Sequence, residues 1–226
     1  MQWIFARHFG LPETQVRVIV PDVGGGFGLK IHIYGDEMTT IAASMLLGRP
    51  VKFTAQRSES FLTDYQGRDL FSRAALALDA NGKILAFRAV NVSNVGARCA
   101  SLSPLSKGSG LVTGSYDIPL ASLASLAVFT NTMPTTPYRS SGRPEVTYAI
   151  ERLIDVAADE LGIDRISLRR RNLVAPERMP YRNAVGMVYD SGRYEENMDR
   201  ARQMADWDGF EARRRDSLAR GRLRGI

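Results

Sequence analysis

The spacing of apolar residues along the chain predicts a mixture of helices and strands. Apolar residues three and four positions apart predict helices over 2–9, from Asp36 to the residue before Gly48, and over 144–161, 164–173 and 195–207. Alternation predicts strands over 16–20 and 51–54, and a hairpin of 71–78 and 83–92 across the turn 79–82. The apolar run 120–130 predicts a buried strand, and the Ser-, Gly- and Pro-rich stretches 100–118 and 131–142 predict loops. The fold class is therefore expected to be α+β, with mixed sheets and packed helices.

The composition is that of a globular protein and does not suggest disorder. Of the 226 residues, 44% are hydrophobic and 24% are charged, which is enough for one large domain or two small ones. The net charge of +6 could indicate an anionic partner such as nucleic acid. A solvated basic helix face or tail is favoured instead, because the charge is concentrated in one stretch: Arg213, Arg214, Arg215, Arg220, Arg222 and Arg224.

Residue types that ligate metals are scarce. The single cysteine, Cys99, excludes an internal disulfide and an all-cysteine metal or iron–sulfur site. The two histidines, His8 and His32, have no partners at ligand spacing, so we expect no metal held directly by the protein. The sequence has neither a transmembrane segment nor a signal peptide, and we expect a soluble, cytoplasmic protein.

A cluster of glycines, residues 23–28 (here the glycine loop), follows the first predicted strand. Glycines let backbone N–H groups approach an anion closely. The loop does not match a P-loop, because Leu29 separates Gly28 from Lys30, and Leu29 also occupies the last glycine position of a dinucleotide-binding fingerprint. An anion cradle and a purely structural turn remain equally good interpretations.

Two arginine-containing segments are further candidates. Residues 137–142, here the Tyr138 loop, lead into the predicted helix at Pro144 and are followed by Arg143, so that arginines and a helix N-terminus could bind an oxyanion. The alternative is a capped helix start, with Ser141 as the cap and Arg143 paired to an acid. Residues 65–69 alone indicate no more than a turn with a solvated arginine, Arg68; residues 66–68 within them are here the Gln66 segment.

Taken together and in this order, the three segments resemble the large subunit of the molybdenum hydroxylases, the family of xanthine dehydrogenases, aldehyde oxidases and aerobic carbon monoxide dehydrogenases. The chain is most similar to the carbon monoxide dehydrogenase branch. The stretches 170–173 and 189–192 also resemble family signatures. The resemblance implies part of a molybdopterin-binding domain, with a first cofactor-binding part over about 1–143. A helical connection over about 144–226 would then lead toward a further part of the subunit.

The resemblance also implies the cofactor and its contacts. The cofactor would be molybdopterin cytosine dinucleotide, with molybdenum held by the pterin, and iron–sulfur clusters and FAD would lie on partner subunits. Arg68 and Phe27 would face a small-molecule substrate, and an activated carbon would be hydroxylated with oxygen from water. The cofactor-binding residues would come from both loops: Gly25, Gly26, Phe27, Gly28, Arg139, Ser140 and Ser141.

Departures from the family pattern limit this interpretation. The late Gly-x-Gly-Glu segment that carries the family's general base is not found, so this glutamate is expected beyond Ile226. The chain is then a central fragment or one piece of a split subunit, and alone it should be inactive. Glu37 and Glu145 are better explained as acids at helix N-termini.

Two positions narrow the range of expected substrates. Ser140 stands where carbon monoxide dehydrogenases carry a copper-binding cysteine, which disfavours carbon monoxide. Ile31 replaces the glutamate of xanthine-type members, which disfavours purines. An aldehyde or an N-heterocycle remains.

Two other functions stay open from the residues themselves. One is a non-redox nucleotide- or anion-binding module that uses Gly24 to Gly28. The other is a basic interaction domain that binds nucleic acid through residues 211–226; few aromatic residues accompany these arginines, so no nucleic-acid partner is expected.

Overall fold

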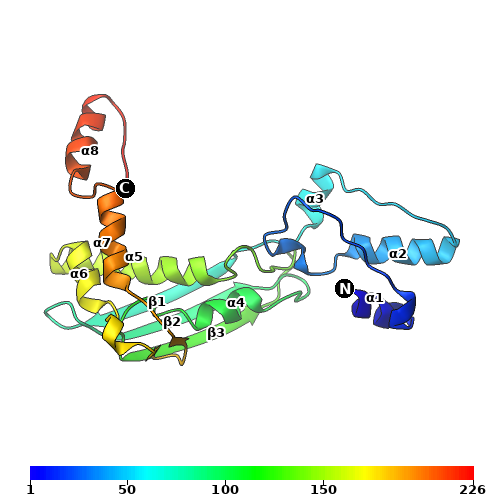
Figure 1. The fold of residues 1–226 in the computed structure, drawn as a ribbon, viewed down its shortest axis with the longest axis horizontal. Helices are drawn as coiled ribbons and strands as arrows, with labels where there is room; N and C mark the ends of the chain where they lie inside the picture. Colours follow the sequence, from blue (N-terminus) through cyan, green and yellow to red (C-terminus); the bar gives the residue numbers. More distant parts are fainter. The chain divides into compact units, whose positions relative to one another are not determined.

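The computed structural model describes residues 1–226, which form two compact units (Figure 1). The first unit comprises Met1–Arg73, Val90–Ser109 and Leu123–Tyr148, and the second comprises Ala74–Ala89, Gly110–Ser122 and Ala149–Ile226. All three candidate segments lie in the first unit. The expected mixture of helices and sheets is confirmed.

The main sheet has three strands, β1 (Leu70–Leu78), β2 (Ile84–Asn94) and β3 (Leu120–Val128), in the order β1-β2-β3 (Figure 1). The predicted hairpin is confirmed as β1 and β2. Its turn is closed by the Asp79 amide donating to the Lys83 carbonyl oxygen, 2.9 Å, and by Asp79 Oδ1 accepting from the Asn81 and Lys83 amides. The strand predicted over 120–130 is present, but its expected burial is wrong, since Leu120 is 67% exposed. An apolar run on an edge strand is buried only where another element covers it.

Four helices lie wholly in the first unit. The first two along the chain were predicted from the sequence, and the third has a capping signal that was not recognised. Helix α1 (Gln2–Phe9) ends at Gly10, and α2 (Gly35–Leu47) ends at Gly48, both in the left-handed conformation that ends many helices. The α2 N-cap is Tyr34 and not Asp36, since the Tyr34 amide donates to the Glu37 carboxylate, 2.9 Å. Helix α3 (Arg57–Thr63) has a similar capping box but was not predicted. Helix α4 (Ser103–Ser109) replaces part of the predicted loop 100–118.

Two predicted strands are wrong. Residues 16–20 and 51–54 belong to no strand of a sheet. Alternating hydrophobicity is a property of a single segment. A β-strand also needs a neighbouring strand to accept and donate its backbone hydrogen bonds.

The second unit is built around α5 (Arg143–Leu161), whose first turns belong to the first unit, and α6 (Arg165–Asn172). Asn172 ties α6 to the hairpin, because its side chain donates to the Gly82 carbonyl oxygen, 2.8 Å, and accepts from the Ile84 amide, 2.9 Å. Arg169 joins α6 to α5 through Glu151 and Asp155, each at 2.9 Å. Phe87, Tyr116 and Tyr181 are buried in this unit, and its most deeply buried hydrophobic side chains are aliphatic: Ile84, Val112, Ile118, Ile150, Ile154, Leu168 and Val174.

The remaining elements complete the second unit. A short antiparallel pair, β4 (Tyr181–Arg182) and β5 (Val188–Tyr189), precedes α7 (Tyr194–Met204) and α8 (Phe210–Ala219). Helix α7 confirms the helix predicted over 195–207, although it ends three residues earlier. No helix has the length and apolarity needed to cross a membrane.

Candidate functional site

The glycine loop is an exposed turn with unusual backbone geometry. Gly25 and Gly28 have φ values of 134° and 91°, and Phe27 between them has φ 50°. The Leu29 amide closes the turn by donating to the Gly26 carbonyl oxygen, 2.9 Å. Within this unit no acceptor takes the amide hydrogens of Gly25, Gly26, Phe27 and Gly28, so they are available to an external anion.

The glycine loop touches the Tyr138 loop. A Cβ atom placed on Gly28 would lie 2.9 Å from the carbonyl oxygen of Pro137, closer than real Cβ atoms approach. Glycine is therefore required here by a close approach of two backbones, in addition to its positive φ.

The Gln66 segment lies against the same loop. The Gln66 amide donates to the Pro134 carbonyl oxygen, 3.1 Å, and the Gln66 carbonyl oxygen accepts from the Thr136 amide, 2.8 Å. A Cβ on Gly67 would lie 2.6 Å from the Cβ of Tyr138. The three segments that the sequence singled out are thus neighbours in space, although more than 100 positions separate the first from the last.

The Tyr138 loop is held in a left-handed conformation. Ser140, Ser141 and Gly142 have successive φ values of 74°, 43° and 86°. The Ser141 amide donates to the Tyr138 carbonyl oxygen, 2.7 Å, and the Ser141 hydroxyl lies 3.0 Å from that of Ser103 in α4. A Cβ on Gly142 would lie 1.7 Å from the carbonyl oxygen of Pro104, so α4 packs directly on the loop backbone.

Strained backbone is concentrated in these segments. Five non-glycine residues in the chain have a left-handed backbone, and four of them are Phe27, Arg68, Ser140 and Ser141. Such conformations cost about 1–3 kcal/mol each and cluster at binding and catalytic sites. The backbone thus marks the same residues that the sequence motifs indicate.

The charged side chains form one connected group. Arg68 donates to the Arg139 carbonyl oxygen, 2.5 Å, and to Glu145 Oε2, 3.2 Å. Arg143 donates to the Ser140 carbonyl oxygen, 3.4 Å, and not to an acid, so the capped-start alternative is wrong about its partner. Ser141 is not the cap it also proposed, because its hydroxyl lies against Ser103.

Comparison with known proteins identifies the family. Residues 1–173 match the molybdopterin cofactor-binding domain. The chain belongs to this family.

The chain is similar in sequence to the large chains of known enzymes. The chain is 39% identical to the carbon monoxide dehydrogenase large chain of Hydrogenophaga pseudoflava over 90% of its own length and 26% of that protein. It is 38% identical to the corresponding chain of Afipia carboxidovorans, over 96% of its own length and 28% of the relative. The chain therefore spans little more than a quarter of the relatives it matches.

Solved structures of this family share the fold. The quinoline 2-oxidoreductase of Pseudomonas putida 86 superposes with a TM-score of 0.90 at 33% identity, covering 97% of this chain and 28% of that one. The carbon monoxide dehydrogenase of Oligotropha carboxidovorans gives a TM-score of 0.87 at 37% identity, covering 97% and 28% of the two chains.

The residues present fit a molybdopterin. No group of three His, Cys, Asp or Glu side chains is placed to hold a metal ion. What the site offers is backbone amides from the glycine loop beside a second exposed loop, and an anionic, polar cofactor that brings its own metal ligands needs such donors.

A pair of stacked tyrosines, which the sequence did not reveal, supports the end of the glycine loop. Tyr34 and Tyr65 have ring centroids 4.3 Å apart, and the Tyr34 hydroxyl donates to the Leu29 carbonyl oxygen, 3.1 Å. Burial raises the pKa of Tyr34 to about 12, so this hydroxyl stays protonated and remains a donor at neutral pH. Tyr65 directly precedes the Gln66 segment and Tyr34 lies outside the three segments, and only their contacts in the fold reveal this role.

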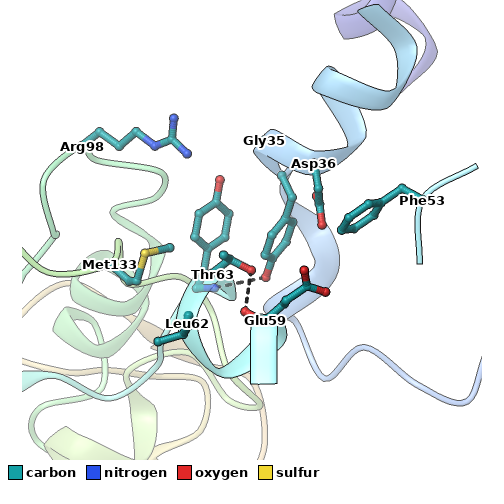
Figure 2. A pocket seen from close by; sticks show the side chains of 10 residues that line it. Gly35, Asp36, Phe53, Glu59, Leu62, Thr63, Arg98 and Met133 are labelled. Carbon is teal, nitrogen blue, oxygen red and sulfur yellow. Dashed lines mark hydrogen bonds between the residues drawn. The ribbon is translucent and has the colours of Figure 1, made fainter. Parts of the chain in front are cut away.

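The same tyrosines line a pocket of about 350 Å³ (Figure 2). Arg98, Phe53 and Met133 approach it from separate segments, and Asp36 and Glu59 contribute its acidic groups. None of the predicted cofactor-binding residues lines this pocket. It is therefore a neighbouring feature of the first unit and not the predicted cofactor site.

Proposed function

We propose that this chain supplies part of the cofactor pocket of a molybdenum hydroxylase. The observation that carries the proposal is the convergence of the glycine loop, the Gln66 segment and the Tyr138 loop, with four of the five left-handed non-glycine residues among them. A structural turn alone does not explain why strained, left-handed backbone occurs in three separate segments that lie together in the fold.

The cofactor would be molybdopterin cytosine dinucleotide. It would be held by Gly25, Gly26, Phe27 and Gly28 on one side and by Arg139, Ser140 and Ser141 on the other. The amides of the glycine loop would donate to anionic groups of the cofactor, and the left-handed turn at Ser140 would bring the second loop's backbone toward the same group. When bound, the cofactor supplies two-electron redox chemistry with water as the oxygen source.

The reaction would replace a C–H bond of an activated carbon by a C–O bond to oxygen from water, and two electrons and two protons would leave. An aldehyde or an N-heterocycle is the proposed substrate. Ser140 supports this choice, because a hydroxyl is a poor ligand for copper(I). The likeness to a quinoline 2-oxidoreductase, at 33% identity, points the same way. Phe27, whose side chain is 59% exposed beside the glycine loop, would face the substrate.

The rest of the machinery would lie outside this chain. We place the general-base glutamate and the second part of the pocket elsewhere in the same subunit, with residues 1–143 as the first cofactor-binding part and 144–226 as the helical connection. Electrons would pass to partner subunits that carry iron–sulfur clusters and FAD, in a cytoplasmic complex. Names such as large chain and large subunit among the relatives support an assembly of this kind.

Molybdenum content tests the proposal. The complete subunit, produced with the maturation machinery for the cofactor, should contain molybdenum, and Gly28→Ala should lower the content severalfold because the new Cβ would meet Pro137. Gly24→Ala is the matched control, since a Cβ there meets nothing within 4 Å. A correctly folded complex without molybdenum would contradict the proposal.

A further inference from the structure

Arg68 has a different set of contacts from those of a substrate-binding arginine. One nitrogen donates to the Arg139 carbonyl oxygen, 2.5 Å, another donates to Glu145, 3.2 Å, and the guanidinium carbon lies 4.9 Å from the centre of the Tyr138 ring. These contacts use both terminal nitrogens and one face of the planar guanidinium group. The Arg68 side chain is 33% exposed and that of Glu145 is 13% exposed, so the carboxylate is the more buried partner of the pair.

The Arg139 carbonyl oxygen, which accepts the shortest hydrogen bond of Arg68, lies at the start of the left-handed turn. The Arg139 carbonyl belongs to the peptide bond that leads into Ser140, the first of three successive left-handed residues. Fixing this carbonyl fixes the direction in which the chain enters the turn. Because a left-handed backbone is unfavourable for Ser140 and Ser141, the turn persists only where surrounding contacts hold it.

Arg68 itself stands on a rigid support. Its neighbour Asp69 accepts from the Asn94 amide at its carbonyl oxygen, 3.2 Å, and from the Asn94 side chain at its carboxylate, 2.8 Å. Asn94 ends β2, and its side-chain oxygen also accepts from the Gly96 amide, 2.8 Å. On the other side, Glu145 lies in the first turn of the 19-residue helix α5. The guanidinium thus connects a strand end and a helix start to the loop between them.

We propose that Arg68 is a positioning residue that clamps the Tyr138 loop in its left-handed conformation, with Glu145 as its counter-ion, and that it does not bind the substrate through its charge. The clamp is a property of this chain; its importance for hydroxylation rests on the function proposed above. Since Glu145 already balances its charge, Arg68 gives the pocket no net attraction for a carboxylate, which suits an uncharged aldehyde or N-heterocycle.

Hydrogen–deuterium exchange of the 226-residue protein tests the clamp directly, without cofactor. Arg68→Gln should speed exchange in the peptide covering 137–146 about tenfold or more, because charge-assisted hydrogen bonds are lost. Arg73→Gln is the matched control: it removes an exposed arginine of β1 and should leave this peptide unchanged. Peptides from β1 and β2 report whether each variant is folded.

Arg68→Lys makes the test decisive if Arg68→Gln unfolds the unit. A lysine keeps the charge opposite Glu145 but lacks the planar fork that reaches Arg139 as well, so exchange in 137–146 should lie between the wild type and the glutamine variant. Unchanged exchange of this peptide in both folded variants, or in Arg68→Lys alone if the other unfolds, would overturn the clamp. That result would leave the molybdenum measurement unaffected, so the two proposals can fail separately.

Discussion

Gly142 is under two constraints at once. Its φ of 86° lies in a region that other residues occupy at a cost, and a Cβ atom there would lie 1.7 Å from the Pro104 carbonyl oxygen. The obstacle is backbone and not the end of a flexible side chain, so relief requires α4 or the loop to move. Gly48 separates the two effects, because it has φ 60° but a Cβ there would meet nothing within 4 Å.

We therefore predict that Gly142→Ala lowers the free energy of unfolding by at least about 2 kcal/mol, while Gly48→Ala lowers it by about 1 kcal/mol. Urea denaturation followed by circular dichroism measures both variants. Equal losses for the two alanine variants would show that the contact with Pro104 carries no energy, contrary to this expectation.

At the residue scale, the sequence could indicate candidates but not their partners. The motifs located Phe27, Ser140 and Arg68, and the backbone strain later fell on the same positions. The motifs could not show that Arg68 bonds to Arg139 and Glu145, because that contact depends on how residues 71 positions or more apart meet in the fold. The exchange experiment tests whether Arg68 holds the Tyr138 loop, and the substrate-side role of Arg68 stays a prediction.

The start of α6 is an element whose stability can be traced to one side chain. Asp164 accepts from the Ser167 amide, 2.8 Å, in the N-cap position. This hydrogen bond lowers the pKa of Asp164 below its ordinary value of 3.8. Asp164→Ala should therefore cost about 1 kcal/mol at neutral pH, as measured by urea denaturation.

The contribution of the Asp164 charge should depend on pH with a definite sign. A carboxyl whose pKa is lowered by folding stabilises the protein above its unfolded pKa, and the stabilisation is lost as the pH falls through the folded value. Asparagine keeps a cap but cannot titrate, so the advantage of the wild type over Asp164→Asn should be present at pH 6 and be lost as the pH falls below about 4 and through the lowered pKa of Asp164. A difference that stays constant over this range would count against the cap as its origin.

At the element scale, success followed the strength of the local signal. The hairpin was predicted because alternation and turn residues agree. Helices α5 and α6 were predicted because apolar periodicity agrees with Gly162 after α5 and with the Asp164 cap of α6. Helix α4 was missed because Ser103–Ser109 contains Pro104 and Gly108, and contacts with the Tyr138 loop compensate for weak helix propensity. The strand predicted over 16–20 was wrong because pairing is not encoded in one segment.

At the scale of the whole molecule, burial was harder to predict than secondary structure. The apolar run predicted as a strand over 120–130 forms β3, yet most residues of β3 are exposed in this chain. Whether a strand is exposed depends on which other elements pack against it, and the sequence of the strand alone does not say which elements these are. The family could be predicted from motifs because these depend on local residues in a fixed order.

The net charge of +6 raises the question of nucleic-acid binding by the C-terminal stretch. Several of its arginines have acidic partners, namely Arg213 with Asp206, Arg214 with Glu211 and Arg220 with Asp216. Residues 211–226 also contain no aromatic residue on which bases could stack. The ion pairs show that several of these arginines are neutralised within the second unit, and the lack of aromatic residues removes a means of binding bases.

We predict that the chain binds a labelled 20-base-pair DNA duplex with a dissociation constant on the order of 10 µM or weaker at physiological salt, the range of non-specific electrostatic contacts. Fluorescence anisotropy measures this affinity. The double variant Arg215→Gln, Arg222→Gln removes two charges for which no acidic partner is found and should weaken binding severalfold at most. Submicromolar affinity with a steep salt dependence that this variant abolishes would instead establish the stretch as a nucleic-acid site, because such affinity requires several simultaneous phosphate contacts by unpaired arginines.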